Sequence, residues 1–208
     1  MAADFQRIEP AGHIVLDIEI AKSVDEVGGW DFTGEMGVSC AVVYEVERGR
    51  YRLFDATELE ELQACIDRAD RITTWNGWTF DLPVIFGVNR PDWETSAFPD
   101  RVGGKDNRTL RDRSNDMLRV AYSGQGLDPD KRSFAHAGWK LPEVAEALGF
   151  GGKCDDGAMA PEMFKKQQWG KLFTYCLHDV HLTAKIDAFA RKHGFIKNLR
   201  NKVVSFNR

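Results

Sequence analysis

The sequence predicts an α/β fold in which helices cover a largely buried sheet, and three observations support this fold class. Residues 13–20, HIVLDIEI, form a β-branched, apolar run typical of a buried strand. Residues 38–54 contain two further β-rich runs on either side of a turn at residues 47–49, which predicts a hairpin that extends the sheet. Residues 71–75 and 76–88 predict a strand, a loop and a helix. This order favours one mixed sheet with helical cover.

Further helices are predicted by apolar residues at helical spacing. Residues 57–69 carry this spacing, with Thr57 as the expected N-cap. Residues 140–150 predict a short amphipathic helix, and the pattern from Pro161 to His193 predicts one long helix that stops at Gly194. These helices are expected to pack on the sheet.

The length of 208 residues, with 43% hydrophobic and 29% charged residues, predicts a single domain over residues 1–208. The polar stretch near residues 89–113 is predicted to be a surface excursion, and residues 114–122 a short strand or extended segment. Residues 195–208 form a basic, partly β-like tail. We find no repeat and no interdomain linker.

Composition also limits the cellular context. The four cysteines, Cys40, Cys65, Cys154 and Cys176, show no spacing typical of a zinc site or a disulfide framework, which favours a reducing compartment. No apolar run approaches the ~20 residues of a membrane span, and no export signal begins the chain. We therefore expect a cytoplasmic protein without a membrane partner. The formal net charge of −4 argues weakly against nucleic-acid binding, unless some acids hold metal.

Two acids interrupt the first predicted strand. Because side chains alternate along a strand, Asp17 and Glu19 point to the same face, roughly 7 Å apart along the backbone. Burying two like charges side by side is costly unless they are protonated or meet a strong cation, such as a divalent metal ion. The alternative is a half-exposed strand with a polar face, which is common in antiparallel sheets.

Two more acids raise the same question. Asp179 falls within the apolar stripe of the predicted C-terminal helix, and Tyr175 lies one turn before it, where a phenol could orient a water molecule. An exposed acid and an ordinary surface aromatic residue are the alternatives. Asp81 lies near the start of a predicted helix, where an acid can simply be stabilised by the helix dipole.

In this order, the segments LDIE, NGWTFDLPV and YCLHDV resemble the three motifs of the DEDD superfamily of 3′–5′ exonucleases. Each motif alone is a weak signal, but the ordered combination, which extends from Asp17 to Asp179, is specific. The first motif corresponds to Asp17 and Glu19. The second motif corresponds to Asn76, Phe80 and Asp81. The third motif corresponds to Tyr175 and Asp179.

The third motif separates two branches of the superfamily. One branch has Tyr four residues before the last Asp, and the other has His five residues before it. Tyr175 satisfies the first pattern, whereas position five before Asp179 is Thr174. The chain therefore resembles the Tyr branch, which includes the proofreading domains of many DNA polymerases. His178 has the wrong offset for the His branch and is expected to be a non-catalytic neighbour.

The resemblance implies an RNase H-like fold, with a mixed central sheet of about five strands, the first strand at its centre, and flanking helices. It also implies two divalent ions, Mg²⁺ or Mn²⁺, roughly 4 Å apart, which would activate the attacking water and stabilise the departing 3′ oxygen. Two such ions would bring the formal net charge from −4 to 0. The implied catalytic residues are Asp17, Glu19, Asp81, Tyr175 and Asp179, and all of them except Tyr175 would hold metal.

Substrate contacts are also implied by the resemblance. Ile18 and Glu19 would lie beside the terminal nucleotide, and Asn76 and Phe80 would line the path of the strand. Trp78 could stack on a base or could pack against the neighbouring helix. Phosphates could be held by Arg108, Arg111 and Arg113 of the polar excursion, or by Lys197, Arg200 and Lys202 of the tail. For each of these residues, solvated surface charge is the ordinary explanation.

The function predicted from these motifs is metal-dependent removal of nucleoside 5′-monophosphates from nucleic-acid 3′ ends, with single-stranded DNA as the favoured substrate. A ribonuclease that trims RNA 3′ ends is an alternative, because no residue decides recognition of the 2′-hydroxyl. A weakly catalytic nucleic-acid-binding module in a repair or replication assembly is another, although such a module would not need all five site residues. The domain is expected to act alone or to serve a polymerase, helicase or repair protein in trans.

Overall fold

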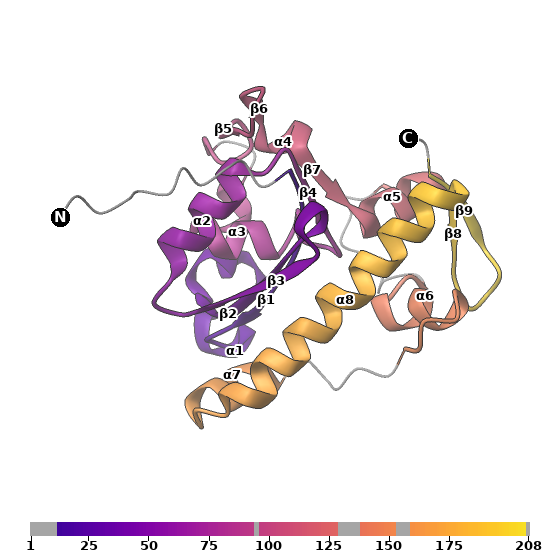
Figure 1. The fold of residues 1–208 in the computed structure, drawn as a ribbon. Coiled ribbons are helices and arrows are strands. Elements are labelled where there is room, and N and C mark those ends of the chain that lie inside the picture. Colours follow the sequence, from indigo (N-terminus) through magenta and orange to yellow (C-terminus); the bar gives the residue numbers. More distant parts are fainter. Residues whose placement is uncertain (1–11, 94–95, 129–137, 153–158, 207–208) are drawn as a thin grey trace.

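A computed structural model gives the fold, and it describes residues 12–93, 96–128, 138–152 and 159–206 (Figure 1). Cys154 lies outside the described residues. The central sheet has five strands in the order β3–β2–β1–β4–β7. Its strands are β1 (His13–Ile20), β2 (Val38–Glu45), β3 (Arg50–Asp55), β4 (Arg71–Thr74) and β7 (Ser114–Asp116).

The sheet is mixed, and its first strand is central, as the resemblance to the exonucleases implied. β1 pairs antiparallel with β2 and parallel with β4, while β3 continues the antiparallel half and β7 the parallel half. The predicted hairpin is β2 and β3, joined by η2 (Val46–Arg48). Gly49 ends this turn with φ of 60°, a left-handed conformation that glycine adopts without steric cost. Local turn chemistry thus fixes the antiparallel half.

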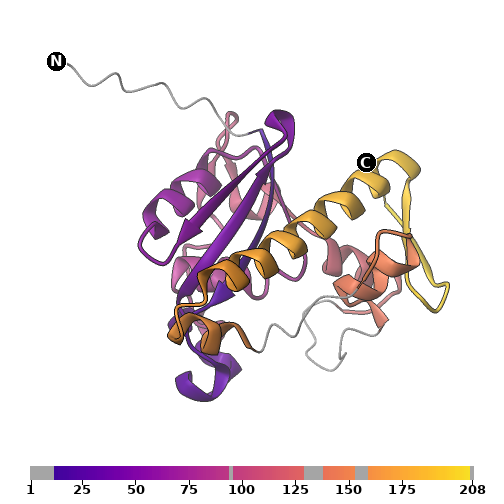
Figure 2. The ribbon, with the colours of Figure 1, turned by 60° about the horizontal axis from the view of Figure 1, so that its bottom comes forward.

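Two hydrophobic layers follow from the alternation of side chains along β1. Ile14, Leu16 and Ile18 pack in one cluster with residues of α2 (Leu59–Arg68) and α3 (Asp81–Phe86). Val15 faces the other side, where it packs with α8 (Trp169–His193). Figures 1 and 2 show α8 crossing one face of the sheet while α2 and α3 cover the other. β1 is therefore buried on both sides.

A further cluster anchors the C-terminal half of α8. The residues of this cluster come from α5 (Met117–Gly124), α6 (Leu141–Ala147) and a hairpin of β8 (Phe195–Lys197) and β9 (Val203–Ser205). Trp139 is fully buried there. Figure 1 shows these elements gathered beside the end of α8 that lies away from α7. Hydrophobic packing thus holds α8 at both of its halves.

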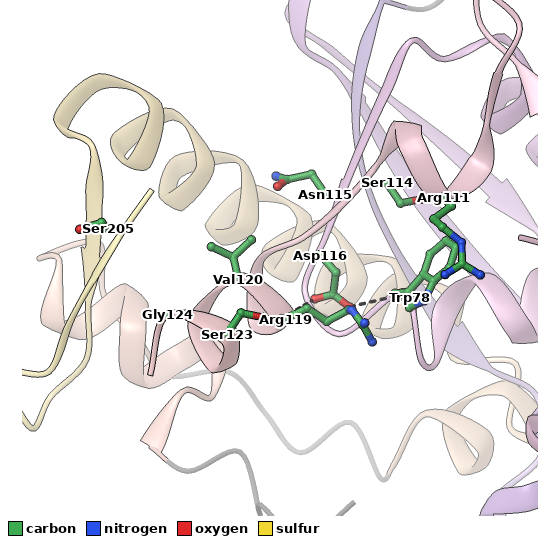
Figure 3. Close-up of a pocket in the computed structure, with 10 residues that line it drawn as sticks. All are labelled: Trp78, Arg111, Ser114, Asn115, Asp116, Arg119, Val120, Ser123, Gly124 and Ser205. Atoms are coloured by element: carbon green, nitrogen blue, oxygen red, sulfur yellow. Dashed lines mark hydrogen bonds between the residues drawn. The ribbon is translucent and has the colours of Figure 1, made fainter. Parts of the chain in front are cut away.

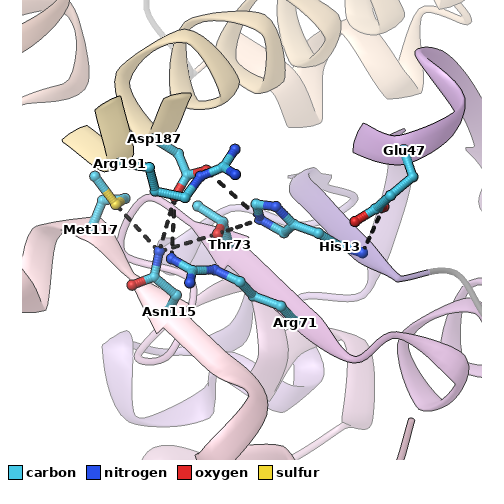
Figure 4. A network of polar contacts seen from close by, with 8 residues as sticks. All are labelled: His13, Glu47, Arg71, Thr73, Asn115, Met117, Asp187 and Arg191. Atoms are coloured by element: carbon cyan, nitrogen blue, oxygen red, sulfur yellow. Dashed lines mark hydrogen bonds and ion pairs between the residues drawn. The ribbon is translucent and has the colours of Figure 1, made fainter. Parts of the chain in front are cut away.

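Polar contacts also fix α8 on the sheet (Figure 4). The buried Asp187 carboxylate accepts hydrogen bonds from Arg191 at 2.8 Å, and from Arg71 and Asn115 at 3.4 Å each. His13 Nε2 lies 2.9 Å from Thr73 Oγ1 and 3.9 Å from Asp187. Burial, reinforced by the nearby arginines, lowers the pKa of His13 to about 3, so this ring is neutral and its contact with Asp187 is not an ion pair. The network sets the register of α8 against β1 and β4.

Three local predictions were wrong in detail. Thr57 is not the N-cap of α2, because Glu58 occupies that position and the helix begins at Leu59. The single helix expected from Pro161 to His193 is two helices, α7 (Ala160–Lys165) and α8, separated at Gln167, whose φ is 54°. After β7, residues 117–124 form α5 instead of continuing as an extended segment, because the Asp116 side chain caps the amides of Leu118 and Arg119.

The stretch near residues 89–113 is polar in sequence but partly packed. Its buried Trp93, Phe98 and Leu110 belong to the cluster beneath α2 and α3. No helix in the described parts of the chain is both long and apolar enough to span a membrane. The remaining short elements are α1 (Val24–Val27), η1 (Trp30–Glu35), η3 (Arg90–Asp92), β5 (Val102–Gly103), β6 (Arg108–Thr109) and α4 (Leu110–Arg113).

Candidate active site

The predicted site acids line one cavity of about 520 Å³ beside the C-terminal half of β1. β1 contributes Asp17 and Glu19, α3 contributes Asp81, and α8 contributes Asp179. Tyr175 lines the same cavity from α8. The structure therefore brings together all five of the predicted catalytic side chains. We call this cavity the acidic pocket.

The first two acids are positioned by strand alternation. Asp17 and Glu19 lie opposite Val42 and Cys40 of β2, and the pairing becomes irregular directly after Glu19. Glu19 is 5% exposed, and Asp17 is half-buried. The half-exposed polar face considered as the alternative does not describe Glu19. Hydrophobic residues on both sides of β1 thus hold two carboxylates where packing alone would favour apolar side chains.

Asp81 reaches the pocket through the loop of residues 76–80. This loop is held by Asp116, whose carboxylate accepts hydrogen bonds from the Asn76 and Trp78 amides at 2.9 and 3.0 Å. Gly77 lies so close to β4 that an added Cβ would be 2.5 Å from Thr74 Cβ. Asp81 is 3% exposed, and its Oδ1 accepts a hydrogen bond from the Ile18 amide at 3.2 Å. The second acidic segment is thereby tied directly to the first.

α8 contributes the remaining groups at helical spacing. Tyr175 and Asp179 are one turn apart and both half-buried, as expected for side chains on the same side of the helix. Cys176 lies beside them, is fully buried, and donates a hydrogen bond from Sγ to the Asp17 carbonyl oxygen at 3.3 Å. His178 is exposed and does not belong to the pocket lining, in agreement with the expectation that it is a neighbour of the site.

The electrostatics of the pocket strongly disfavour several charged carboxylates without a counter-ion. Burial, followed by the charges of Asp81, Asp179 and Glu19, raises the pKa of Asp17 well above its usual range. Burial is also the main cause that raises the pKa of Glu19 to about 10 and that of Asp81 to about 7. Among the described lining residues there are five acids, Asp25 included, and no Lys, Arg or His. The protein thus supplies a cavity of negative groups without its own cation.

The donor set suits a hard divalent cation. One ligand atom each of Asp17, Glu19 and Cys176 lie within 4.8 Å of one another, and Asp81 and Asp179 line the same cavity. Carboxylate oxygens are the preferred protein ligands of Mg²⁺ and Mn²⁺. Burial raises the pKa of the Cys176 thiol, so this thiol stays protonated and its hydrogen bond to the β1 backbone gives it a packing role. The four carboxylates are the fitting ligands.

Only some of the predicted substrate-binding residues line the acidic pocket. Ile18 and Phe80 line the acidic pocket, as Glu19 does. Asn76 has φ of 69°, and its side-chain oxygen accepts a hydrogen bond from the Thr79 hydroxyl at 2.8 Å, so it shapes the loop. Trp78 is 6% exposed and packs against Trp93 and Phe98, with ring centroids 5.7 and 5.5 Å away. For Trp78 the packing alternative fits the structure, because a buried ring offers no face to a base.

Sequence reasoning missed two tryptophans of the pocket. Trp30 is 55% exposed, and its ring meets that of Phe80 edge-on at 6.1 Å between centroids. Trp75 is 8% exposed, and its indole N–H is buried without a hydrogen-bond partner among the described residues. Both rings line the acidic pocket. The signal for Trp30 was a large aromatic residue in the polar segment of residues 22–37, where no core position was predicted.

Residues 55–186 match the family described as "Predicted 3'-5' exonuclease related to the exonuclease domain of PolB". The chain belongs to this family. The matched range covers most of the chain and contains Asp81, Tyr175 and Asp179, whereas Asp17 and Glu19 precede it. It is therefore a member of a 3′–5′ exonuclease family, and its nucleic-acid substrate class is implied at that level.

A solved structure supports the fold independently. The family B DNA polymerase from the hyperthermophilic archaeon Pyrobaculum calidifontis is similar over 86% of this chain, with a TM-score of 0.57 and 20% sequence identity. At this identity, the likeness establishes the RNase H-like fold of the polymerase exonuclease domain. The match covers 24% of the length of the polymerase chain. No curated protein matches the sequence.

Proposed function

We propose that the protein is a metal-dependent 3′–5′ exonuclease of the Tyr branch that removes nucleoside 5′-monophosphates from single-stranded DNA. The observation that carries the proposal is the acidic pocket, in which four carboxylates from three separate elements converge without a cationic side chain among the described lining residues. Folding does not require such a cluster, which costs free energy until a counter-ion neutralises it. Family membership supports the reaction class.

Asp17, Glu19, Asp81 and Asp179 are the proposed ligands of two Mg²⁺ or Mn²⁺ ions. Bound ions of this kind lower the pKa of water and stabilise charge on the attacking and departing oxygens of a phosphodiester. The protein's contribution is to hold the four carboxylates rigidly. β1 is fixed by strands on both sides, Asp81 by its bond to the Ile18 amide, and α8 by the Asp187 network. These contacts hold the four carboxylates in fixed positions throughout the reaction.

Tyr175 is the proposed group that orients the attacking water. Its hydroxyl can donate one hydrogen bond and accept another, and it comes from the same helix as Asp179, one turn away. Because both side chains are carried by a single rigid helix, their relative position is well defined. The role is therefore positional and needs no ionised phenol.

The terminal nucleotide is proposed to lie between β1 and the pair of rings formed by Trp30 and Phe80. Trp30 exposes an aromatic face at the acidic pocket, and a base of any sequence can stack on such a face. Ile18 lines the cavity beside Glu19 and offers an apolar contact to the same nucleotide. Recognition of this kind tolerates every base.

The activity test uses a 5′-labelled single strand with Mg²⁺, Mn²⁺ or EDTA. We expect a ladder of products shortened from the 3′ end, dependent on metal and lost in Asp17→Ala. Parallel arms with duplex DNA and with RNA of the same sequence decide strandedness and sugar preference. Binding without any turnover in the metal arms would contradict the proposal and favour a binding module.

We also propose that residues 1–208 work as one catalytic domain in the cytoplasm, the compartment that the widely spaced cysteines favour, alone or in trans to a polymerase, helicase or repair protein. α8 supports the single domain, because it contributes buried residues both to the cluster on one face of the sheet and to the cluster formed with α5, α6, β8 and β9. Cooperative unfolding in one transition, followed by both circular dichroism and tryptophan fluorescence, is the expected result. Two separated transitions would contradict it.

A further inference from the structure

A second, cationic cavity system lies along the edge of the sheet, away from the acidic pocket. A cavity of about 500 Å³ and another of about 350 Å³ share Ser114, Asn115 and Val120, so they adjoin each other. β7, which provides Ser114 and Asn115, is the last strand of the sheet. We call these two adjoining cavities together the β7 groove, and the first of them is shown in Figure 3.

Five guanidinium groups line the β7 groove, which is an unusual concentration for a chain with a net charge of −4. They belong to Arg71, Arg108, Arg111, Arg113 and Arg119. Figure 3 shows Arg111 beside the ring of Trp78, with a separation of 5.7 Å between the guanidinium carbon and the ring centroid. Arg108 and Arg111 are exposed. Arg111 has a fixed platform beneath it, which lowers the entropy lost when it binds a ligand.

The three carboxylates in the groove are largely occupied by the protein itself. The Asp116 oxygens accept hydrogen bonds from four backbone amides and are buried. Asp112 accepts a hydrogen bond from the Thr109 hydroxyl at 2.8 Å, and Asp70 accepts one from the Lys105 amide at 2.7 Å. These acids are thus tied to local turns and caps, although hydrogen bonds from neutral groups leave their charges in place. Five arginines face three aspartates in the groove, and Arg71 is also paired with Asp187, which leaves a formal excess of one positive charge.

Arg113 adds a buried charge beneath this surface. It is 2% exposed and donates hydrogen bonds to the carbonyl oxygens of Ile66, Ala69 and Arg108. Among the described residues, no carboxylate lies within 4.0 Å of its guanidinium, and its Nη2 is buried without a partner. The charges of Asp67 and Asp70 still act on this guanidinium from a greater distance, so Arg113 adds only part of its positive charge to the groove.

The loop of residues 76–80 joins the groove to the acidic pocket. Trp78 lines the β7 groove and Phe80 lines the acidic pocket, and two residues of extended chain span at most ~7 Å. We propose that the β7 groove binds the phosphodiester backbone of the same single strand whose 3′ end lies in the acidic pocket. This inference rests on the proposed function for the direction of the strand. Arginine forks match phosphate oxygens, whereas a protein strand added to β7 would need no such charge.

The test measures binding of a 5′-fluorescent strand of about 20 nucleotides by anisotropy in EDTA, so that binding is scored even if hydrolysis fails. The groove variant is Arg111→Gln with Arg119→Gln. The matched control is Lys185→Gln with Lys192→Gln, which removes two positive charges from exposed positions of α8. DNA and RNA strands of one sequence form separate arms. Unfolding midpoints of both variants establish that they are folded.

We expect the groove variant to bind the long strand about tenfold more weakly, with the slope of log K against log salt reduced by about 1.4, and the control to bind as the wild type does. A dinucleotide, which is too short to reach the groove from the acidic pocket, should bind all variants equally. The proposal is overturned if the groove variant binds the long strand normally, if the control loses as much affinity, or if dinucleotide binding falls equally. Hydrolysis assayed separately on the dinucleotide tests the acidic pocket alone.

Discussion

Replacing Asp81 by Asn should make the metal-free protein more stable at pH 8, although it removes a proposed metal ligand. Burial raises the pKa of this carboxyl from 3.8 to about 7. The folded state therefore binds its proton more tightly than the unfolded state does, and stability falls as the pH rises from about 4 to about 7. Asn keeps the oxygen that accepts the Ile18 amide and carries no charge.

The expected gain in stability follows from the raised pKa of Asp81. At 1.36 kcal/mol per pKa unit, the buried carboxylate costs at most about 4 kcal/mol above pH 7. Because the charge of Asp81 also raises the pKa values of Asp17 and Glu19, we expect a measured gain of about 1 to 4 kcal/mol for Asp81→Asn. This gain corresponds to about 2 to 4 °C per kcal/mol in a chain of this size. Near pH 4.5 the difference should fall to about 1 kcal/mol or less, because Asp81 is protonated in the folded wild type and the pH is close to its usual pKa of 3.8.

Thermal and urea unfolding at pH 4.5, 6 and 8 with EDTA would measure this gain. Added Mn²⁺ should then reverse the order, because binding at 100 times Kd stabilises the wild type by about 2.7 kcal/mol and should stabilise the variant much less. Asp25→Asn is the matched control, since it makes the same change at an exposed position of the same pocket and should leave the midpoint within about 0.5 kcal/mol of the wild type. A variant that is no more stable than the wild type at pH 8 in EDTA would refute the reasoning.

Three further predictions concern other groups of the site. Tyr175→Phe should lower kcat at least tenfold at unchanged KM, and a rate within about twofold, less than ~0.5 kcal/mol of barrier, would mean that the hydroxyl has no role. Trp30→Ala should raise KM for a single strand about tenfold, because base stacking contributes about 1–3 kcal/mol. Phe32→Ala is the control: it removes another exposed aromatic ring of η1 and should leave KM unchanged. Gly77→Ala should destabilise the fold by about 1–3 kcal/mol, since its Cβ would meet Thr74 at 2.5 Å, and it should lower activity by displacing Asp81. Gly170→Ala is the control, because its Cβ would enter open space. Equal unfolding midpoints for the two variants would contradict this prediction.

The central elements of the fold could be predicted because their signals are local. The apolar run of β1, the glycine turn between β2 and β3, and the strand, loop and helix around Asp81 each carry their own sequence pattern. The break between α7 and α8 could not be predicted, because the residues around Gln167 are ordinary helix formers and only the tertiary structure imposes the left-handed conformation there. α5 was missed for a related reason, since its cap Asp116 also serves the loop before Asp81.

Asp17, Glu19 and Asp179 drew attention because charged residues in apolar surroundings conflict with packing, and that conflict is visible in sequence. The resemblance of the three motifs to those of 3′–5′ exonucleases joined these acids with Asp81 in one site. Trp30 and Trp75 could not be assigned in this way, because an aromatic residue is equally at home in a core and at a pocket, and exposure depends on tertiary structure. The β7 groove depends on residues 71 and 108–119, which only the pairing of β4 with β7 brings together. The sequence suggested individual cations in these segments, but it did not indicate that they line one groove.

Anomalous diffraction from crystals grown with Mn²⁺ would show whether the acidic pocket holds two metal ions. We predict two Mn²⁺ peaks roughly 4 Å apart in this pocket, coordinated by Asp17, Glu19, Asp81 and Asp179 and absent from crystals of Asp17→Asn. Mn²⁺ peaks only at other positions, or an acidic pocket that stays free of metal at millimolar Mn²⁺ and pH 8, would contradict this prediction.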